Sequence, residues 1–347
     1  MKKFHCQDLP VIFSNADKVL LKDHMILLNF AGHRRVLSTS AWNGGIQEDL
    51  KCVFNYDLSH NKTVFCELLE PTLAGHMRRL GEVAGLPSQN SGLCTAAQMK
   101  NLSIIQECWE DICVTAIVTA GIDENGGRAG DPASWQEKNG ELGVPVGTIN
   151  LLLHFNCNLS PGALAGALLT ATEAKAVAIQ ELQLPSKVSC GIATGSGTDG
   201  AILVCDPTST EYRTDCGKHS KLGEMIGQTV LHGVKDALFL QTEASVKRVR
   251  DALRLLGRFG LCEEYLKAYF PESSSEELQV FCKEEEIWTS AAIYANLLDL
   301  ENWGIFTHKQ VRKTAEKLFS MRGKNELEAF ISYMKKIKYN QERKKME

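Results

Sequence analysis

A glycine loop bearing hydroxyl and carboxylate side chains is the first feature of this sequence that could do chemistry. Residues 191–204 read GIATGSGTDGAILV and contain a match to G-x-G-x-x-G. In dinucleotide-binding proteins this pattern follows a strand and opens a helix, whose N-terminus holds the pyrophosphate. Here the loop is followed by Ala201 to Cys205, which are rich in β-formers, so we expect a strand and not a helix. The loop is therefore either an ordinary turn or part of another kind of site, and it presents Thr194, Ser196, Thr198 and Asp199.

Three other glycine-flanked polar clusters stand at the ends of predicted strands. They are Ser40 to Gly45 (SAWNGG), Thr119 to Gly121 leading on to Gly130-Asp131, and Gly147 to Asn150 (GTIN). Each by itself is typical of a turn, because Gly, Asn, Asp and Thr favour turns for local reasons. Four such clusters together favour a shared site, since loops on a rigid sheet commonly carry binding groups. The candidate substrate-binding residues are Asn43, Gly44, Thr119, Gly121, Asp131, Thr148, Asn150, Thr194, Gly195 and Gly197.

Two further segments supply acid–base groups. Glu173 interrupts the small-residue surface LLTATEAKAVA, where it is either solvent-facing or a buried carboxylate that shuttles protons. His219 lies in CGKHS, just before a predicted helix, where backbone N–H groups and Lys218 favour an anion. His219 is therefore either a proton donor or an ordinary residue of a helix start. With Thr198 and Asp199, these two residues form the candidate catalytic set.

The elements that must position these residues alternate between strands and helices over the first part of the chain. The expected strands are Lys51–Tyr56, Ile112–Thr119, Thr148–Phe155, Lys187–Thr194 and Ala201–Cys205. The expected helices are Pro71–Ala84, Ser160–Leu182, which has Ser as its N-cap and Pro at its first position, and His219–Leu240. Two further predictions are a hairpin over Met25–Ser38 that turns near Gly32, and a helix that opens at a Thr95-x-x-Gln98 capping box and runs to Trp109.

The 347 residues indicate about two domains. Charged, glycine-poor segments with helical periodicity follow Ser245. We therefore predict an α/β or α+β fold: a layered sheet-and-helix catalytic domain over residues 1–242 and an all-helical C-terminal domain over residues 243–347. Because nothing in that second domain resembles a chemical site, we expect it to serve in packing within the protein or in oligomerisation.

Composition gives no reason to expect nucleic acid or a membrane as a partner. A hydrophobic content of 44% allows a sizeable core, and a formal charge of −4 gives no reason to expect nucleic acid or an anionic membrane surface. The basic tail after Tyr333 is a modest exception of the kind that is usually solvated. The N-terminal residues lack a continuous apolar region, and no apolar run approaches the roughly 18 residues that span a bilayer. We expect a soluble cytoplasmic protein.

Cysteine usage supports a reducing compartment. The twelve cysteines include no C-x-x-C pair and no Cys/His ligand box, so zinc is not indicated. Cys113, Cys190 and Cys205 lie in strand-like apolar runs, where we expect them to behave as small hydrophobic residues.

Seven short runs stand in order between about Leu37 and Gly227. They are STSAWNGG, GLCTAAQM, VTAG followed by GRAGDP, VGTINLLL, TATEAKA, ATGSGTDGAILV and GKHSKLGEMIG. In this order they resemble the adenosylcobinamide amidohydrolases of corrinoid salvage. The usual loop of that family has a second Thr and an Ala where this chain has Ser196 and Gly200; Ser keeps the hydroxyl, and Gly loosens the backbone. The resemblance does not reach the predicted C-terminal domain.

The resemblance implies hydrolysis of the amide that joins the aminopropanol arm to the corrin ring of adenosylcobinamide, giving adenosylcobyric acid for coenzyme B12 synthesis. It implies a small-molecule corrinoid substrate whose cobalt belongs to the substrate; no separate cofactor is identified. The corrinoid-binding pattern D-x-H-x-x-G is absent from the sequence, so a corrinoid would bind differently. Such chemistry needs a nucleophile, donors for the tetrahedral oxyanion and an acid for the leaving amine.

The sequence contains no G-x-S-x-G elbow. We therefore favour a water, or a hydroxyl such as that of Thr198, activated by Asp199 or Glu173, with His219 as the acid. Asn43, Asn150 and the N–H groups of the glycine loop are the candidate oxyanion donors.

Two other functions stay open at this point. One is a corrinoid-binding protein without hydrolysis. The other is a phosphate-binding enzyme, such as a kinase, built on the glycine loop, although the sequence lacks G-x-x-x-x-G-K-[ST]. Neither nucleic acid nor a membrane is expected as a partner, and homo-oligomerisation is left open.

Overall fold

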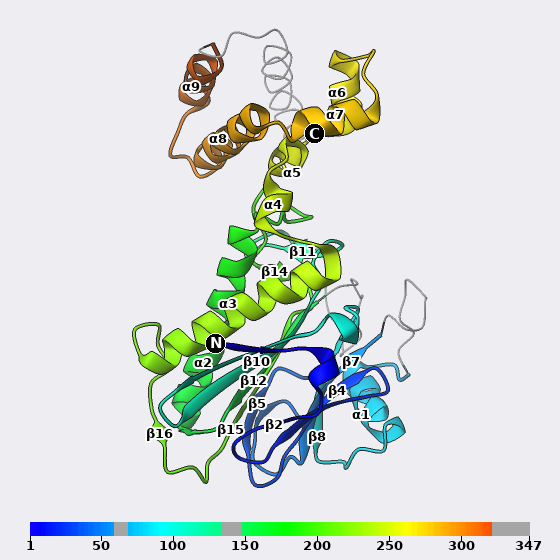
Figure 1. Cartoon of the computed structure of the whole chain (residues 1–347), viewed down its shortest axis with the longest axis vertical. Coiled ribbons are helices and arrows are strands. Elements are labelled where there is room, and N and C mark those ends of the chain that lie inside the picture. Colours follow the sequence, from blue (N-terminus) through cyan, green and yellow to red (C-terminus); the bar gives the residue numbers. More distant parts are fainter. Residues whose placement is uncertain (59–68, 134–147, 321–347) are drawn as a thin grey trace. The chain divides into compact units, whose positions relative to one another are not determined.

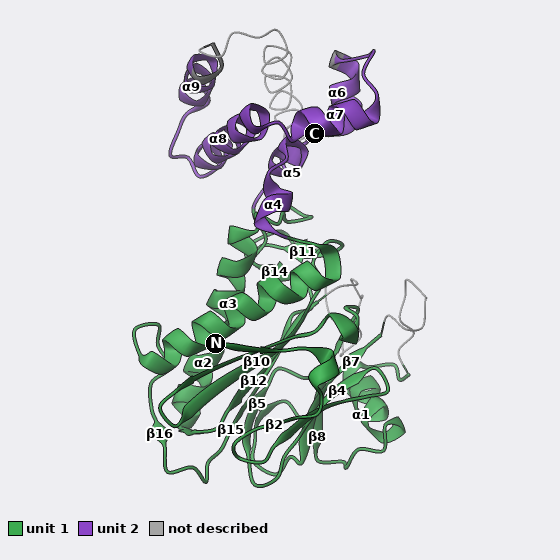
Figure 2. Ribbon diagram, in the orientation of Figure 1, with its two compact units in different colours: residues 1–188, 192–244 green, residues 189–191, 245–347 purple. Residues whose placement is uncertain are grey.

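The computed structural model describes residues 1–58, 69–133 and 148–320. The chain forms two compact units (Figure 2): one holds residues 1–188 and 192–244, and the other holds residues 189–191 and those from 245 onward. The first unit combines sheets and helices, whereas the second is helical (Figure 1). The predicted fold class, mixed α and β with a helical C-terminal region, is confirmed.

The elements of the first unit have the following bounds. Its strands are β1 (Lys2–Phe4), β2 (Val11–Ile12), β3 (Lys18–Lys22), β4 (Met25–Asn29), β5 (Arg35–Ser38), β6 (Gly45–Gln47), β7 (Cys52–Asp57), β8 (Asn90–Thr95), β9 (Ser103–Trp109), β10 (Ile112–Ala120), β11 (Gly126–Gly127), β12 (Ile149–Phe155), β13 (Asn158–Leu159), β14 (Gly195–Ser196), β15 (Gly200–Cys205) and β16 (Tyr212–Arg213). Its helices are α1 (Leu73–Val83), α2 (Pro161–Glu181) and α3 (Lys221–Thr242), with short 3-10 turns η1 (Cys6–Asp8) and η3 (Met99–Asn101).

Two large sheets form the centre of this unit. Over the described residues, one has the strand order β1-β9-β10-β12-β15-β5-β6 and the other β2-β3-β4-β7-β8. The pairs β12–β15 and β7–β8 are parallel, and the other neighbours in these two sheets are antiparallel. Because the larger sheet brings β10, β12 and β15 together, it places the ends of three strands that carry predicted polar clusters beside one another.

Side-chain alternation decides what each face of the larger sheet contacts. One face packs against α2 and α3 through residues such as Val118, Leu151 and Leu203. The opposite face packs against the second sheet, with residues of β10, β12 and β15 meeting residues of β3, β4 and β7. The outer face of the second sheet packs against α1. The unit therefore has four layers, helix–sheet–sheet–helix.

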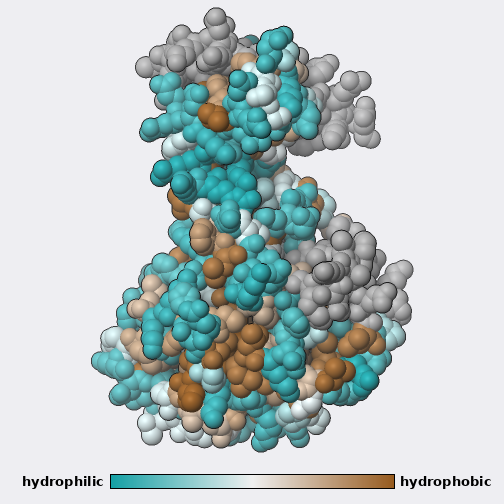
Figure 3. Space-filling model, turned by 45° about the vertical axis from the view of Figure 1, so that its right-hand side comes forward, coloured by the Kyte–Doolittle hydropathy of each residue, from teal (hydrophilic) through white to brown (hydrophobic). Residues whose placement is uncertain are grey.

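Helix α2 lies close to the sheet because its buried positions are mostly alanine. Ser160 caps it, since its Oγ accepts a hydrogen bond from the Ala163 backbone N at 3.0 Å. By length and apolar composition alone, α2 could cross a membrane, but half of its most apolar stretch is buried inside the protein. A core helix of a globular domain has the same properties. The face shown in Figure 3 is largely hydrophilic, with apolar residues gathered in limited areas.

The predicted hairpin over Met25–Ser38 is wrong. Strand β4 belongs to one sheet and β5 to the other, and β4 instead forms a hairpin with β3. The tight turn lies at Asp23 and His24, whose φ angles of 43° and 64° suit a type I′ turn between two strands.

Two other predicted elements are also wrong. Residues 103–109 form strand β9 and not a helix; Thr95 Oγ accepts from the Ala97 N–H at 3.0 Å, which makes a turn instead of a helix cap. The predicted strand over Lys187–Thr194 does not form: within it only Ile192 makes a β-bridge, with Pro185, and Ser189 to Gly191 belong to the second unit.

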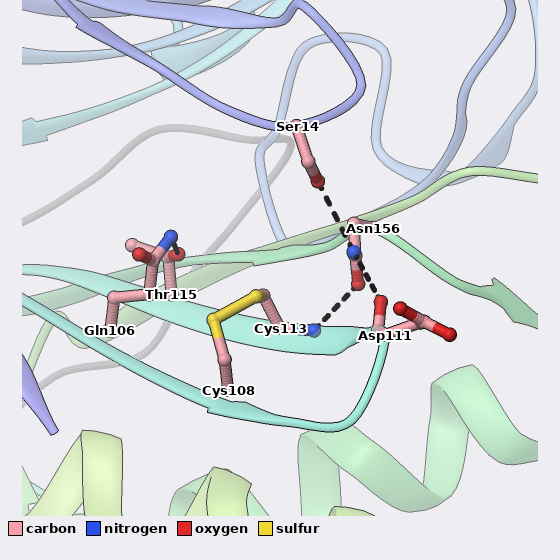
Figure 4. The surroundings of a disulfide bond; sticks show 7 residues. All are labelled: Ser14, Gln106, Cys108, Asp111, Cys113, Thr115 and Asn156. Carbon is pink, nitrogen blue, oxygen red and sulfur yellow. Dashed lines mark hydrogen bonds between the residues drawn. A yellow bond between two sulfur atoms is a disulfide. The ribbon is translucent and has the colours of Figure 1, made fainter.

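Cys113 forms a disulfide with Cys108 and is not a free apolar side chain (Figure 4). The two residues lie directly opposite each other in the β9–β10 hairpin, with their Cα atoms 4.1 Å apart. Asn156 closes the end of this hairpin: its Oδ1 accepts from the Cys113 N–H at 2.7 Å, and its Nδ2 donates to the Asp111 carbonyl at 2.8 Å. Cys205, in contrast, is buried in the core as expected.

The second unit contains the helices α4 (Val246–Val249), α5 (Ala252–Gly257), α6 (Glu263–Tyr269), α7 (Ser275–Cys282), α8 (Glu285–Asn302) and α9 (His308–Ser320). The helices from α5 through α9 share a separate apolar core. Arg258 binds the Asp299 carboxylate through two hydrogen bonds of 2.6 Å each and also donates to the Cys190 carbonyl at 2.7 Å. The basic tail after Tyr333 lies outside the described residues.

Candidate functional site

Asp199 is the centre of the polar cluster that the glycine loop forms. Its Oδ1 accepts hydrogen bonds from the backbone N of Ile149 and of Ser196, both at 3.0 Å, and from Ser196 Oγ at 2.6 Å. Its Oδ2 forms an ion pair with Lys175 Nζ, and both side chains are mostly buried. One carboxylate thus joins the start of β12, the glycine loop and helix α2.

Gly195 is needed at its position because this ion pair fills the space beside it. A Cβ on Gly195 would lie 2.1 Å from Asp199 Oδ2 and 2.8 Å from Lys175 Nζ. The loop as a whole is not the hairpin turn of the simpler interpretation, because β14 pairs with β11 and β15 joins the large sheet. The predicted strand after the loop is confirmed as β15, so the helix that a dinucleotide site requires is absent at this position.

Asn150 and Thr119 meet between the two large sheets. Asn150 Nδ2 donates to Asn55 Oδ1 at 2.8 Å and to the Cys94 carbonyl at 2.9 Å. Asn55 Nδ2 in turn donates to Thr119 Oγ1 at 2.8 Å. All three side chains are almost completely buried. Since both donors of Asn150 are used within the protein, its amide holds the ends of β12, β7 and β8 together.

Thr148 links this buried cluster to the glycine loop. Its Oγ1 donates to the Thr198 carbonyl and lies 3.3 Å from Asn150 Oδ1. Gly200 leaves room for the same amide, because a Cβ there would lie 3.1 Å from Asn150 Oδ1 and 2.7 Å from Leu93.

The segment that contains Asn43 and Gly44 lies at the same end of the larger sheet. Thr39 Oγ1 accepts from the Ala201 N–H at 2.9 Å, one residue beyond Gly200. Asn43, in a left-handed conformation with φ of 47°, donates to the Asn90 carbonyl at 2.7 Å. Gly44 is required because a Cβ would lie 2.2 Å from the Ser40 carbonyl oxygen.

The segment after β10 also packs against the glycine loop. Thr194 Oγ1 accepts from the Ala129 N–H at 3.0 Å, and the Gly197 N–H donates to the Asn125 carbonyl at 3.2 Å. Asp131 accepts from the Ser186 hydroxyl at 2.6 Å. Gly121 has open space at its Cα, where the nearest atom to an added Cβ would be 4.0 Å away. The four clusters predicted from sequence therefore lie at one end of the larger sheet, where Asn43 contacts the start of β8 and Asn150 contacts Cys94 near the other end of that strand. Gly147 of the third cluster lies outside the described residues.

Glu173 and His219 are not brought to Asp199. The side chain of Glu173 is 53% exposed and pairs with Lys218, so the interpretation of Glu173 as a buried carboxylate is wrong. Glu173 and Lys175 are two residues apart on α2, about 200° around the helix axis, so they point to opposite sides. His219 is exposed in the turn before α3, next to Lys218.

Sequence reasoning missed Lys175, Asn55 and the role of Ser196. Lys175 lies in the same run as Glu173. Its position among the alanines on the sheet-facing side of α2 was the feature that could have indicated a buried lysine. Asn55 offered no such signal, because only the pairing of the two sheets brings it to Asn150.

A second buried polar cluster occupies the opposite end of β12. His154 Nε2 donates to Asp17 Oδ2 at 3.0 Å, and Arg34 Nε donates to the same oxygen at 2.7 Å. Burial lowers the pKa of His154, and the hydrogen bond with Asp17 opposes this effect without reversing it. His154 also stacks on the ring of Phe13, with the ring centroids 4.3 Å apart, so its place is that of a structural residue.

Among the described residues, no group of three or more His, Cys, Asp and Glu side chains is arranged to hold a metal ion. The cluster around Asp199 and Asn150 instead brings together hydroxyl, carboxamide, carboxylate and ammonium groups where the two sheets meet.

Comparison with known proteins identifies the chain's relatives. A sequence profile of the adenosylcobinamide amidohydrolases matches residues 12–246. An uncharacterised protein of Methanocaldococcus jannaschii is 32% identical over 243 residues, which cover 66% of this chain and 91% of that protein. The adenosylcobinamide amidohydrolase of Methanosarcina mazei is 28% identical over 231 residues, which cover 64% of this chain and 98% of that protein.

Among solved structures, that of the PH0078 protein of Pyrococcus horikoshii matches 67% of this chain and 82% of its own, at 12% identity. Its TM-score of 0.32 is too low to indicate a shared fold. The profile match covers well over half of the sequence and nearly all of the first unit. The chain therefore belongs to the adenosylcobinamide amidohydrolase family.

Proposed function

We propose that this protein hydrolyses the amide between the aminopropanol arm and the corrin ring of adenosylcobinamide, giving adenosylcobyric acid and 1-amino-2-propanol in corrinoid salvage. The observation that carries the proposal is that the four polar clusters lie at one end of the larger sheet, where Asp199 joins β12, the glycine loop and α2, in a member of this family. The substrate is a small-molecule corrinoid, and its cobalt is part of the substrate.

Burial divides the candidate residues into two roles. Asn43, Gly44, Gly121, Asp131, Thr194, Gly197 and Thr198 are partly or fully exposed and would contact the substrate. Thr119, Thr148, Asn150 and Gly195 are buried and would hold the strand ends that carry the first group. Such support suits a large planar ligand, because binding loops hold their geometry best when a rigid scaffold and buried hydrogen bonds position them.

Asp199 is the proposed proton acceptor in this reaction. It takes a proton from the nucleophile, which is a water or a hydroxyl of the loop such as that of Thr198. The ammonium group of Lys175 balances its charge. Glu173 and His219 are the further acid–base candidates; Glu173 pairs with Lys218, the residue before His219.

The decisive experiment incubates the full-length protein with adenosylcobinamide and measures free 1-amino-2-propanol. We expect release by the wild type and a loss of about a hundredfold or more in turnover for Asp199→Asn. Glu173→Gln and His219→Asn, assayed in parallel, test the other two acid–base candidates. If Asp199→Asn keeps turnover within a few-fold of wild type, the assignment of the base fails. The same assay with and without a chelator tests for a catalytic metal.

The alternative function is corrinoid binding without hydrolysis. It predicts a corrinoid absorption spectrum that changes on mixing with protein, while no 1-amino-2-propanol appears. A phosphate-binding role for the glycine loop has less support, because the N–H groups of Ser196, Gly197 and Thr198 donate within the protein.

Cytoplasmic location and homo-oligomerisation stay predictions. The Cys108–Cys113 disulfide counts against a cytoplasmic location, since disulfides are rare in reducing compartments. The role of the second unit is likewise a prediction of packing or oligomerisation.

A further inference from the structure

We infer that Ser196 is the nucleophile of the proposed hydrolysis, oriented by Asp199 and indirectly by Lys175. The inference rests on the proposed function and names a residue that the sequence patterns did not favour. Its basis is the 2.6 Å hydrogen bond from Ser196 Oγ to Asp199 Oδ1. A hydroxyl becomes a competent nucleophile when an adjacent base within about 2.6–3.2 Å can remove its proton.

The position of Ser196 meets the other requirements of an attacking group. Its neighbours in sequence are Gly195 and Gly197, so the two flanking residues carry no side chain beside the hydroxyl. The residue is half-buried, and Gly197 and Thr198 beside it are exposed, so a ligand on the surface of the loop reaches it. The structure places the Ser196 hydroxyl on the Asp199 carboxylate, and the Thr198 carbonyl accepts a hydrogen bond from Thr148.

Lys175 is a positioning residue in this arrangement. It comes from a different element, α2, and its ion pair fixes the second oxygen of Asp199. The first oxygen is then directed at Ser196 and at the start of β12. The absence of a side chain at Gly195 permits this close approach of Lys175 and Asp199.

The proposed reaction needs water as its only co-reactant. Ser196 Oγ attacks the amide carbonyl carbon and its proton moves to Asp199. The tetrahedral oxyanion then collapses, the C–N bond breaks, and Asp199 returns the proton to the leaving nitrogen, which releases 1-amino-2-propanol. The remaining ester on Ser196 is cleaved by water, which gives one proton to Ser196 through Asp199 and its hydroxyl to the corrinoid acid.

The test compares Ser196→Ala and Ser196→Thr with Thr208→Ala in the full-length protein. Thr208 is a matched control, because its Oγ1 donates to Asp206 Oδ1 at the same 2.6 Å at the other end of β15. With adenosylcobinamide as the substrate, we expect Ser196→Ala to lower kcat on the order of a thousandfold or more and to leave KM within a few-fold. Ser196→Thr keeps the hydroxyl and is expected to restore part of kcat, and Thr208→Ala is expected to match wild type.

A second measurement does not depend on the folding of a variant. Wild-type enzyme turning over in the presence of hydroxylamine is expected to give the corrinoid hydroxamate, and acid quenching is expected to give a corrinoid acyl group on the peptide that contains Ser196. Wild-type turnover without hydroxamate, or a Ser196→Ala enzyme within tenfold of wild type, overturns the assignment. If the wild type releases no 1-amino-2-propanol, the proposed function itself fails, so the two failures are distinguishable.

Discussion

Asn150 and Asn55, which lie in different sheets and 95 residues apart, are joined by a hydrogen bond of 2.8 Å from Nδ2 of the first to Oδ1 of the second. Because Asn55 also donates to Thr119, this pair fixes the end of the double sheet where the glycine loop begins. The inward face of β12 thus carries an amide at the site end, Leu152 in the middle, and His154 at the opposite end.

The Asn55–Asn150 pair should contribute measurably to stability. Asn55→Ala leaves Thr119 Oγ1 and one donor of Asn150 without their partner in a buried environment. We expect the free energy of unfolding to fall by about 1–3 kcal/mol, measured by urea denaturation. Asn101→Ala, which removes a less buried bond to Gln241, should cost less than about 1 kcal/mol. Equal losses for the two variants would contradict the importance of the inter-sheet pair.

Two of the ion pairs on α2 should differ strongly in their effects. Lys175→Met leaves the mostly buried carboxylate of Asp199 without a counter-charge, and we expect a loss of about 3–5 kcal/mol in the free energy of unfolding. Lys218→Met breaks the exposed pair with Glu173 and should change stability by less than about 1 kcal/mol. The measurement is urea denaturation at low and high salt, and only the Lys218 effect should be sensitive to salt. A Lys175→Met protein as stable as wild type would show that the ion pair does not hold the loop.

Stability should fall as the solution is acidified below about pH 6.5. The pKa of His154 is lowered by burial, so the unfolded chain binds a proton at a higher pH than the folded protein does. The contribution of neutral His154 to the free energy of unfolding is therefore fully present above the pKa that histidine has in the unfolded chain. It is lost as the pH falls toward the lower pKa of the folded protein, at up to about 1.4 kcal/mol per pH unit. His76, whose pKa burial also lowers, adds a slope of the same sign.

The test replaces His154 by Gln and compares it with His232→Asn, which changes an exposed residue. The slope of unfolding free energy between about pH 5 and 6.5 should decrease for the first variant and stay unchanged for the second. At lower pH a further loss is expected from Asp17. Burial pushes its pKa up, but the hydrogen bonds from His154 and Arg34 outweigh this, and the pKa lies below 3.8. An unchanged slope in the His154 variant would contradict its buried, neutral state.

The Cys108–Cys113 disulfide should make only a modest contribution to stability. It closes a loop with a sequence separation of 5, and the chain-entropy relation gives about 2 kcal/mol for so short a loop. The Cys108→Ala, Cys113→Ala double variant should therefore remain folded with that loss. Peptide mapping without reductant should recover the two residues in one linked fragment. Recovery of both as free thiols from protein isolated with its thiols blocked would show that the bond does not form.

The sequence by itself determined several local features of this protein. Runs of β-formers gave β10, β12 and β15, and the Ser160-Pro161 pair gave the start of α2, because these signals depend on neighbouring residues only. Four glycine-flanked polar clusters, read together, predicted a shared site. The same local signals failed at residues 95–109, where the capping-box pattern competed with a strand that is stabilised only by its partners β1 and β10.

The tertiary structure alone decided which groups meet. Asn55 reaches Asn150 because two sheets pack face to face, and no spacing along the chain records that contact. Helix α2 turns Lys175 toward Asp199 and Glu173 toward solvent, although the two residues share one short run. The physical reason is the same in each case: burial and pairing of a polar side chain depend on what packs opposite to it, which is set by the assembled layers and not by its neighbours in sequence.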